Sequence, residues 1–99
     1  MASGPNGASP HHELSDRVIQ PGEPVVIDIG GTMPDGYCSD STRTYSVGEP
    51  PEEFRAYYSV LQESQRVACD YVRPGVTAES IDAAARRVIE DAGYGEYFV

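Results

Sequence analysis

The 99-residue sequence is poor in basic side chains and contains no tryptophan. Its 7 basic residues stand against 16 acidic ones, which gives a formal net charge of −9 at pH 7. Proteins that bind nucleic acid present a basic face to the phosphates, so this charge balance argues against a nucleic-acid partner. Anionic membrane surfaces are disfavoured for the same reason.

Long hydrophobic runs are also missing. No apolar stretch approaches the roughly 18 residues needed to cross a bilayer, and the N-terminus lacks the pattern of a signal peptide. We therefore expect a cytoplasmic protein without a membrane partner. The two cysteines, Cys38 and Cys69, form no C-x-x-C pair, so the sequence predicts neither a disulfide framework nor a zinc knuckle.

The composition, with 39% hydrophobic and 23% charged residues, is typical of a folded globular protein. Residues 1–10 show no periodic apolar pattern and predict an irregular segment. The β-branched run 24–29 predicts a buried strand, and residues 37–47 predict a second strand. Because the turn sequence 33–36 lies between them, the two strands are expected to form a β-hairpin.

Two helices are predicted after the hairpin. Residues 50–53, with two prolines and two glutamates, have the character of a helix start, and an apolar stripe runs from Phe54 to Val72. Thr77 is the expected N-cap of the second helix, which Gly93 ends. Residues 94–99 predict the opening of a further strand. The expected fold class is therefore α+β.

Asp28 lies in the middle of the apolar first strand, where a buried charge needs a partner. It could face solvent or pair with Arg43. If the turn is a three-residue loop, Asp28 lies opposite Thr42 and shares a face with Asp40 as a diagonal neighbour. A two-residue loop places the two carboxylates on opposite faces. Like charges on one face repel, so either one carboxylate is protonated or cations lie between them, and hard oxygen ligands suit one divalent ion or a pair.

Three short motifs occur in this order: Pro10-His11-His12, Asp28-Ile29-Gly30, and Ser39-Asp40-Ser41-Thr42-Arg43-Thr44. In this combination the sequence resembles the pita-bread metallopeptidases that act on Xaa-Pro bonds, namely prolidase and aminopeptidase P. The resemblance implies a partial pita-bread fold, with an antiparallel sheet followed by two helices. Residues 1–99 are then expected to be part of a catalytic domain, without the N-terminal domain and the C-terminal half of the catalytic domain.

The resemblance also implies roles for individual residues. Asp28 is the expected ligand of one metal, and Asp40 the carboxylate that bridges two. His11 is the expected substrate-pocket residue, while Thr42 and Arg43 are expected to support the bridging carboxylate and the sheet. The implied cofactors are two divalent ions, Mn²⁺ or Co²⁺ with Zn²⁺ as a further option. A proline-containing peptide is the implied substrate, and a homodimer the implied assembly.

The remaining ligands that such a site needs, a histidine and two glutamates, lie downstream in the family, and no histidine follows His12. His12 itself is expected to be the exposed neighbour of His11. Since two carboxylates alone bind divalent ions weakly, we expect this chain to be a fragment that is inactive by itself.

Two alternatives come from other functional classes. Residues 28–32, Asp-Ile-Gly-Gly-Thr, resemble the phosphate-binding hairpin of sugar kinases in the actin-like superfamily. Those proteins carry the motif near the start of the chain, without the motifs that surround it here. The second alternative is a pita-bread module that binds without catalysing, although retention of both Asp28 and Asp40 argues against a metal-free site.

Overall fold

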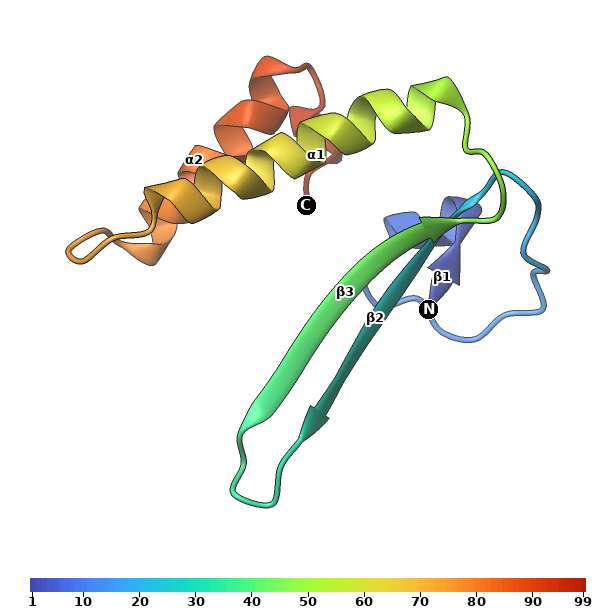
Figure 1. The fold of residues 1–99 in the computed structure, drawn as a ribbon, viewed down its shortest axis with the longest axis horizontal. Coiled ribbons are helices and arrows are strands. Elements are labelled where there is room, and N and C mark those ends of the chain that lie inside the picture. Colours follow the sequence, from blue (N-terminus) through green and yellow to red (C-terminus); the bar gives the residue numbers. More distant parts are fainter. The chain divides into compact units, whose positions relative to one another are not determined.

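The computed structural model describes residues 1–99, which divide into two compact units, Met1–Glu52 and Glu53–Val99. The first unit holds strands β1 (Ala2–Ser3), β2 (Pro24–Thr32) and β3 (Cys38–Ser46), with the 3₁₀ helix η1 (Gly4–Ala8) (Figure 1). The second holds helices α1 (Glu52–Tyr71) and α2 (Ala78–Asp91) and the 3₁₀ turn η2 (Gly95–Tyr97), with the first residue of α1 at the boundary. Neither α-helix combines the length and the apolar character of a membrane span.

The first unit is built on the long hairpin of β2 and β3. The antiparallel register runs from Pro24 opposite Ser46 to Thr32 opposite Cys38. The loop at its end closes through two backbone hydrogen bonds, from Met33 N to Tyr37 O and from Gly36 N to Met33 O, both 2.8 Å. Gly36 has a φ of +89°, which glycine adopts without a steric penalty. Of the two loop lengths that the sequence allows, the structure therefore has the three-residue loop.

A short third strand completes the sheet, in the order β1-β2-β3 (Figure 1). Ala2 pairs with Val26 and Ser3 with Val25, so the expectation of a wholly irregular segment over residues 1–10 is wrong. A strand of two residues is too short to show an alternation of apolar and polar side chains. The pairing instead satisfies backbone groups at the free edge of β2, which no local sequence signal reveals. The contact buries Val25 and Ser3, which are 7% and 6% exposed.

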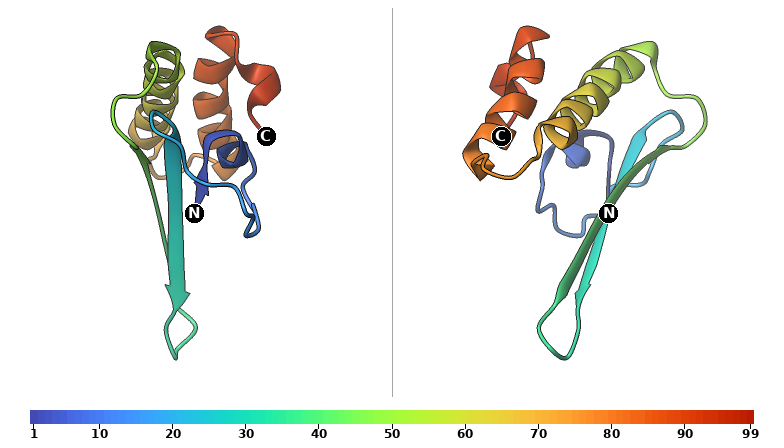
Figure 2. Two further views of the ribbon diagram at one scale, coloured as in Figure 1. Left: turned by 90° about the vertical axis from the view of Figure 1, so that its right-hand side faces the viewer. Right: turned by 60° about the vertical axis from the view of Figure 1, so that its left-hand side comes forward.

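The second unit pairs the two helices, which lie side by side in the views of Figures 1 and 2. The buried Ser64 of α1, 2% exposed, donates its hydroxyl proton to the carbonyl oxygen of Ala85 in α2 at 2.9 Å. Ile89 of α2 is the buried apolar residue of this unit. The predicted N-cap is confirmed, because Thr77 Oγ1 accepts a hydrogen bond from Ser80 N at 3.1 Å.

The end of the chain differs from the sequence expectation. Residues 94–99 were predicted to open a strand, whereas Gly95–Tyr97 form the turn η2. A strand needs a neighbouring strand for its backbone groups, and the second unit contains only helices. Aromatic side chains of this segment pack against the helices instead: the ring of Tyr94 lies 6.5 Å from that of Tyr57 in α1. The guanidinium of Arg86 lies 4.8 Å from the centre of the Phe98 ring and also donates to the Phe98 carbonyl.

Candidate metal centre

The hairpin register places two carboxylates on one face of the sheet. Asp28 lies opposite Thr42, and Asp40 lies opposite Gly30. Because side chains alternate between the faces of a strand, Asp28 and Asp40 project from the same face as diagonal neighbours. Both residues are exposed. The face therefore presents hard oxygen donors of the kind that divalent cations bind.

Thr42 is the immediate partner of Asp28. Its hydroxyl donates a hydrogen bond of 2.5 Å to Asp28 Oδ1. A side chain directly opposite in the ladder lies closer than a diagonal one, and the expected support of Asp40 by Thr42 stays a prediction. Thr42 thus fixes the carboxylate of Asp28.

Arg43 occupies the opposite face of the sheet. It pairs in register with Ile27, and its Nη1 donates to the backbone oxygen of Thr42 at 2.7 Å and to Ser41 Oγ at 3.5 Å. These contacts tie Arg43 to β3, and its expected support of the bridging carboxylate and of the sheet stays a prediction. The alternative in which Arg43 neutralises Asp28 is excluded by the same register.

Gly30, opposite Asp40, allows the two backbones to come close together. A Cβ atom at this position would clash with the carbonyl oxygen of Ser39, whereas the neighbouring Gly31 has open space at the equivalent point. Glycine is thus required at position 30 for close approach and not for a positive φ. The D-x-G motif combines a ligand candidate with the residue that keeps the strands in this arrangement.

A cavity of about 220 Å³ lies beside Asp28 and Thr42. Val26 and His12 also line it, and the Nε2 atom of His12 is buried without a hydrogen-bond partner. His11 is exposed and is not among the lining residues. The structure therefore brings His12, which was expected to be exposed, next to Asp28; the role of His11 in substrate contact stays a prediction.

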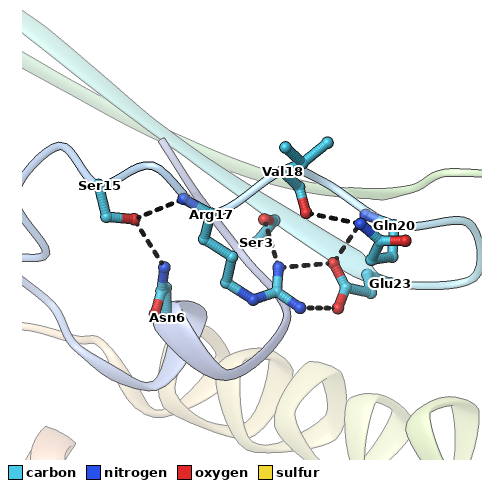
Figure 3. Close-up of polar contacts among 7 residues, drawn as sticks. All are labelled: Ser3, Asn6, Ser15, Arg17, Val18, Gln20 and Glu23. Carbon is cyan, nitrogen blue, oxygen red and sulfur yellow. Dashed lines mark hydrogen bonds and ion pairs between the residues drawn. The ribbon is translucent and has the colours of Figure 1, made fainter.

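An ion pair between Arg17 and Glu23 lies in the same unit (Figure 3). Hydrogen bonds from Arg17 are the largest cause that lowers the pKa of Glu23 to about 2, and a hydrogen bond from the backbone of Gln20 adds to it. Sequence reasoning missed this pair because its partners come from a segment without apolar periodicity. The only signal was the presence of opposite charges at positions 17 and 23.

Divalent ions fit the donor chemistry of this face only in part. Asp28 and Asp40 supply carboxylate oxygens, but no group of three or more His, Cys, Asp or Glu residues that could hold a metal ion is gathered in the chain. The 99 residues thus provide part of a ligand set.

The family model of metallopeptidase family M24 matches residues 1–99. The chain belongs to metallopeptidase family M24. Membership implies divalent metal ions, in agreement with the carboxylate face. It also removes support from the sugar-kinase interpretation of residues 28–32, because this M24 match covers the whole chain.

Several relatives of this M24 chain carry the name of a dipeptidase. "Probable dipeptidase PepE" of Mycobacterium tuberculosis is 59% identical over 99 residues, which are 100% of this chain and 26% of the relative. "Xaa-Pro dipeptidase" of Lactobacillus delbrueckii subsp. lactis is 47% identical over 99 residues, which cover 100% of this chain and 27% of the relative. The M24 chain thus spans about a quarter of the length of the curated relatives it matches.

The fold agrees with a solved M24 structure. The crystal structure of dipeptidase PepE from Mycobacterium ulcerans superposes with a TM-score of 0.91 at 62% sequence identity. The match covers 98% of this chain and 26% of that one. The predicted α+β class, a partial pita-bread fold with an antiparallel sheet followed by two helices, is confirmed.

Proposed function

We propose that residues 1–99 form part of the catalytic domain of a dinuclear-metal peptidase that hydrolyses Xaa-Pro peptide bonds. The observation that carries the proposal is the register of β2 and β3, which sets Asp28 and Asp40 on one face of an M24 chain. Relatives named as Xaa-Pro dipeptidases support the choice of substrate. A proline-containing peptide is therefore the proposed partner.

In this proposal Asp28 holds one ion and Asp40 contacts both. Mn²⁺ and Co²⁺ are the first candidates, with Zn²⁺ as a further option. When bound, such ions polarise the scissile carbonyl and lower the pKa of bound water. Thr42 orients the Asp28 carboxylate through its hydroxyl, and Arg43 braces β3 from the other face. His11, in the segment before β2, is proposed to contact the substrate.

The 99-residue chain alone is proposed to be inactive. Its two carboxylates share a face, but no third metal-binding side chain joins them. Two carboxylates do not complete the coordination shell of a divalent ion. Added Mn²⁺ is therefore expected to give no hydrolysis of an Xaa-Pro dipeptide by this chain, and turnover would refute this part of the proposal.

Peptidase activity is tested in the native polypeptide, meaning the natural protein with residues 1–99 and any residues that adjoin them. With Mn²⁺ present, it should cleave an Xaa-Pro dipeptide in preference to the matching Xaa-Ala dipeptide. Asp28→Asn and Asp40→Asn should each abolish cleavage, whereas Asp16→Asn, an exposed aspartate of the same unit, should not. Full activity in either of the first two variants would contradict the proposal.

The proposal also includes a cytoplasmic location and a homodimer. Light scattering on the purified native polypeptide measures the mass directly, and a monomeric mass would contradict the dimer. Fractionation of the source cells tests the location, which a membrane-bound or secreted protein would contradict.

The competing function is a pita-bread module that binds peptides without cleaving them. The pairing of Asp28 with the Thr42 hydroxyl speaks against it, because a binding module has no need to orient a metal-ligand carboxylate. Peptide binding without turnover in the presence of Mn²⁺, Co²⁺ and Zn²⁺ would favour this alternative.

A further inference from the structure

His12 reaches the carboxylate face from a segment that has no helix or strand. Residues 9–23 connect η1 to β2 and contain only turns, bends and irregular backbone. Even so, His12 lines the cavity beside Asp28, and its Nε2 atom is buried without a hydrogen-bond partner. Backbone hydrogen bonds join the end of the segment to Val47, from Gly22 N to Val47 O at 2.6 Å and from Val47 N to Glu23 O at 3.2 Å. The part of the segment nearer His12 has no such ladder, so side-chain contacts are its main anchors.

Arg17 provides the strongest of these contacts (Figure 3). Its guanidinium donates to both carboxylate oxygens of Glu23, through Nη1 at 2.8 Å and through Nη2. Nη1 also donates to Ser3 Oγ at 3.3 Å, and Glu23 Oε2 accepts a hydrogen bond from Gln20 N at 3.0 Å. Two parallel hydrogen bonds from a planar guanidinium fork to a carboxylate fix the orientation of the two groups as well as their distance. A single point charge, such as an ammonium group, fixes only the distance.

This network ties three parts of the unit together. Ser3 belongs to β1, Arg17 to the connecting segment, and Glu23 directly precedes β2. The Arg17 and Glu23 side chains are only 29% and 18% exposed. An ion pair sheltered to this degree is screened less than a fully exposed one.

A second, weaker contact holds the same segment to η1. Asn6 Nδ2 donates to Ser15 Oγ at 3.4 Å, and Ser15 Oγ also accepts a hydrogen bond from Arg17 N at 3.4 Å. Figure 3 shows this contact on one side of Arg17 and Glu23 on the other. The segment is thus fixed on the C-terminal side of His12, three to eleven residues beyond it in the chain.

We propose that the Arg17–Glu23 ion pair is a positioning element for His12, which keeps the imidazole beside Asp28 and Thr42 by anchoring the segment to β1 and to the start of β2. The inference deepens the proposed function and rests on it for its catalytic meaning. The Nε2 atom of His12 has no protein partner, so this ring nitrogen keeps its capacity for one hydrogen bond. Arg17 and Glu23 act through His12 and do not touch the substrate.

The test is chemical modification of the two histidines in the native polypeptide, without metal or peptide. Diethyl pyrocarbonate modifies accessible imidazoles, and fragmentation mass spectrometry separates the neighbouring sites. With His11 exposed and His12 Nε2 buried, His12 should react about tenfold more slowly than His11. Equal rates in the wild-type protein would overturn the inference.

Two variants and a control define the role of the pair. Glu23→Gln should bring the His12 rate close to that of His11, and Arg17→Lys should have an intermediate effect because the charge remains and the fork is lost. Glu63→Gln removes an exposed partner of Arg66 in α1 and should leave the ratio unchanged. An unchanged ratio in Glu23→Gln would overturn the inference.

Hydrogen exchange separates positioning from general unfolding. In Glu23→Gln the amides of β2 and β3 should keep their wild-type protection while His12 becomes reactive. Loss of hairpin protection together with the change at His12 would mean that the pair is simply structural and would also overturn the inference. Neither measurement uses peptide cleavage, so a failure here and a failure of the proposed peptidase activity are distinguishable.

Discussion

The hydroxyl of Thr42 donates a 2.5 Å hydrogen bond to the carboxylate of Asp28 across the β2–β3 ladder. The bond links a candidate metal ligand to the S-D-x-T-R-T motif, which also contains Asp40. This single hydrogen bond leaves the other lone pairs of the Asp28 carboxylate free to bind a cation. The same hairpin thus supplies the oxygen donors and orients one of them.

Replacing Thr42 tests whether this orientation matters. Thr42→Val keeps the shape of the side chain but removes the hydroxyl, and we expect Mn²⁺ affinity in the native polypeptide to fall about tenfold. Thr42→Ser keeps the hydroxyl and should retain most of the affinity. Titration calorimetry measures both. Equal affinity for the valine variant and the wild type would show that the hydrogen bond does not support metal binding.

Glycines 30 and 31 offer a matched pair of substitutions. A methyl group at Gly30 meets the carbonyl oxygen of Ser39, whereas one at Gly31 meets nothing within 4 Å. Gly30→Ala should therefore destabilise the unit by about 1–3 kcal/mol, as overpacking does. Gly31→Ala should change the unfolding free energy much less.

Denaturant unfolding compares these two variants, and hydrogen exchange locates the damage. Protection should be lost around Gly30 and Ser39 in the first variant only. Equal stability of the two variants would contradict the close approach of the backbones at position 30.

The pKa of Glu23 predicts a pH dependence. In the folded protein hydrogen bonds from Arg17 lower this pKa from 4.5 to about 2. Since the folded pKa lies below the unfolded one, the ionised carboxylate contributes stability above pH 4.5, and this contribution is lost as the pH falls toward 2. An NMR titration of the Glu23 carboxyl carbon measures the shift.

Arg17→Met provides the control for this titration. Without the guanidinium, the pKa of Glu23 should return most of the way to its ordinary value, because the contact with Arg17 is the first cause of the shift. A Glu23 carboxyl that titrates near 4.5 in the wild-type protein would contradict the ion pair.

Local sequence signals predicted the parts of the fold that depend on neighbouring residues. The turn before Tyr37 needs a glycine with positive φ at position 36, and the loop length fixes the parity that sets Asp28 and Asp40 on one face. The cap at Thr77 is local in the same sense. Because the sequence allowed both a two-residue and a three-residue loop, the shared carboxylate face was one of two alternatives, and the register decides between them.

Contacts between distant segments could not be read in the same way. The pairing of β1 with β2 and the position of His12 beside Asp28 depend on how an irregular segment folds back over the sheet. The expected strand at residues 94–99 failed because its apolar character does not tell whether a neighbouring strand is present. Such features follow from packing, which a sequence pattern does not encode.

The most direct test of the central claim is a double-mutant cycle on Mn²⁺ binding. Dissociation constants are measured for the native polypeptide, for Asp28→Asn, for Asp40→Asn, and for the double variant. If the two carboxylates hold the cations jointly, each single change removes most of the affinity, and the double change costs much less than the sum of the two. Independent, additive losses, or wild-type affinity in either single variant, would contradict a shared metal centre on the β2–β3 hairpin.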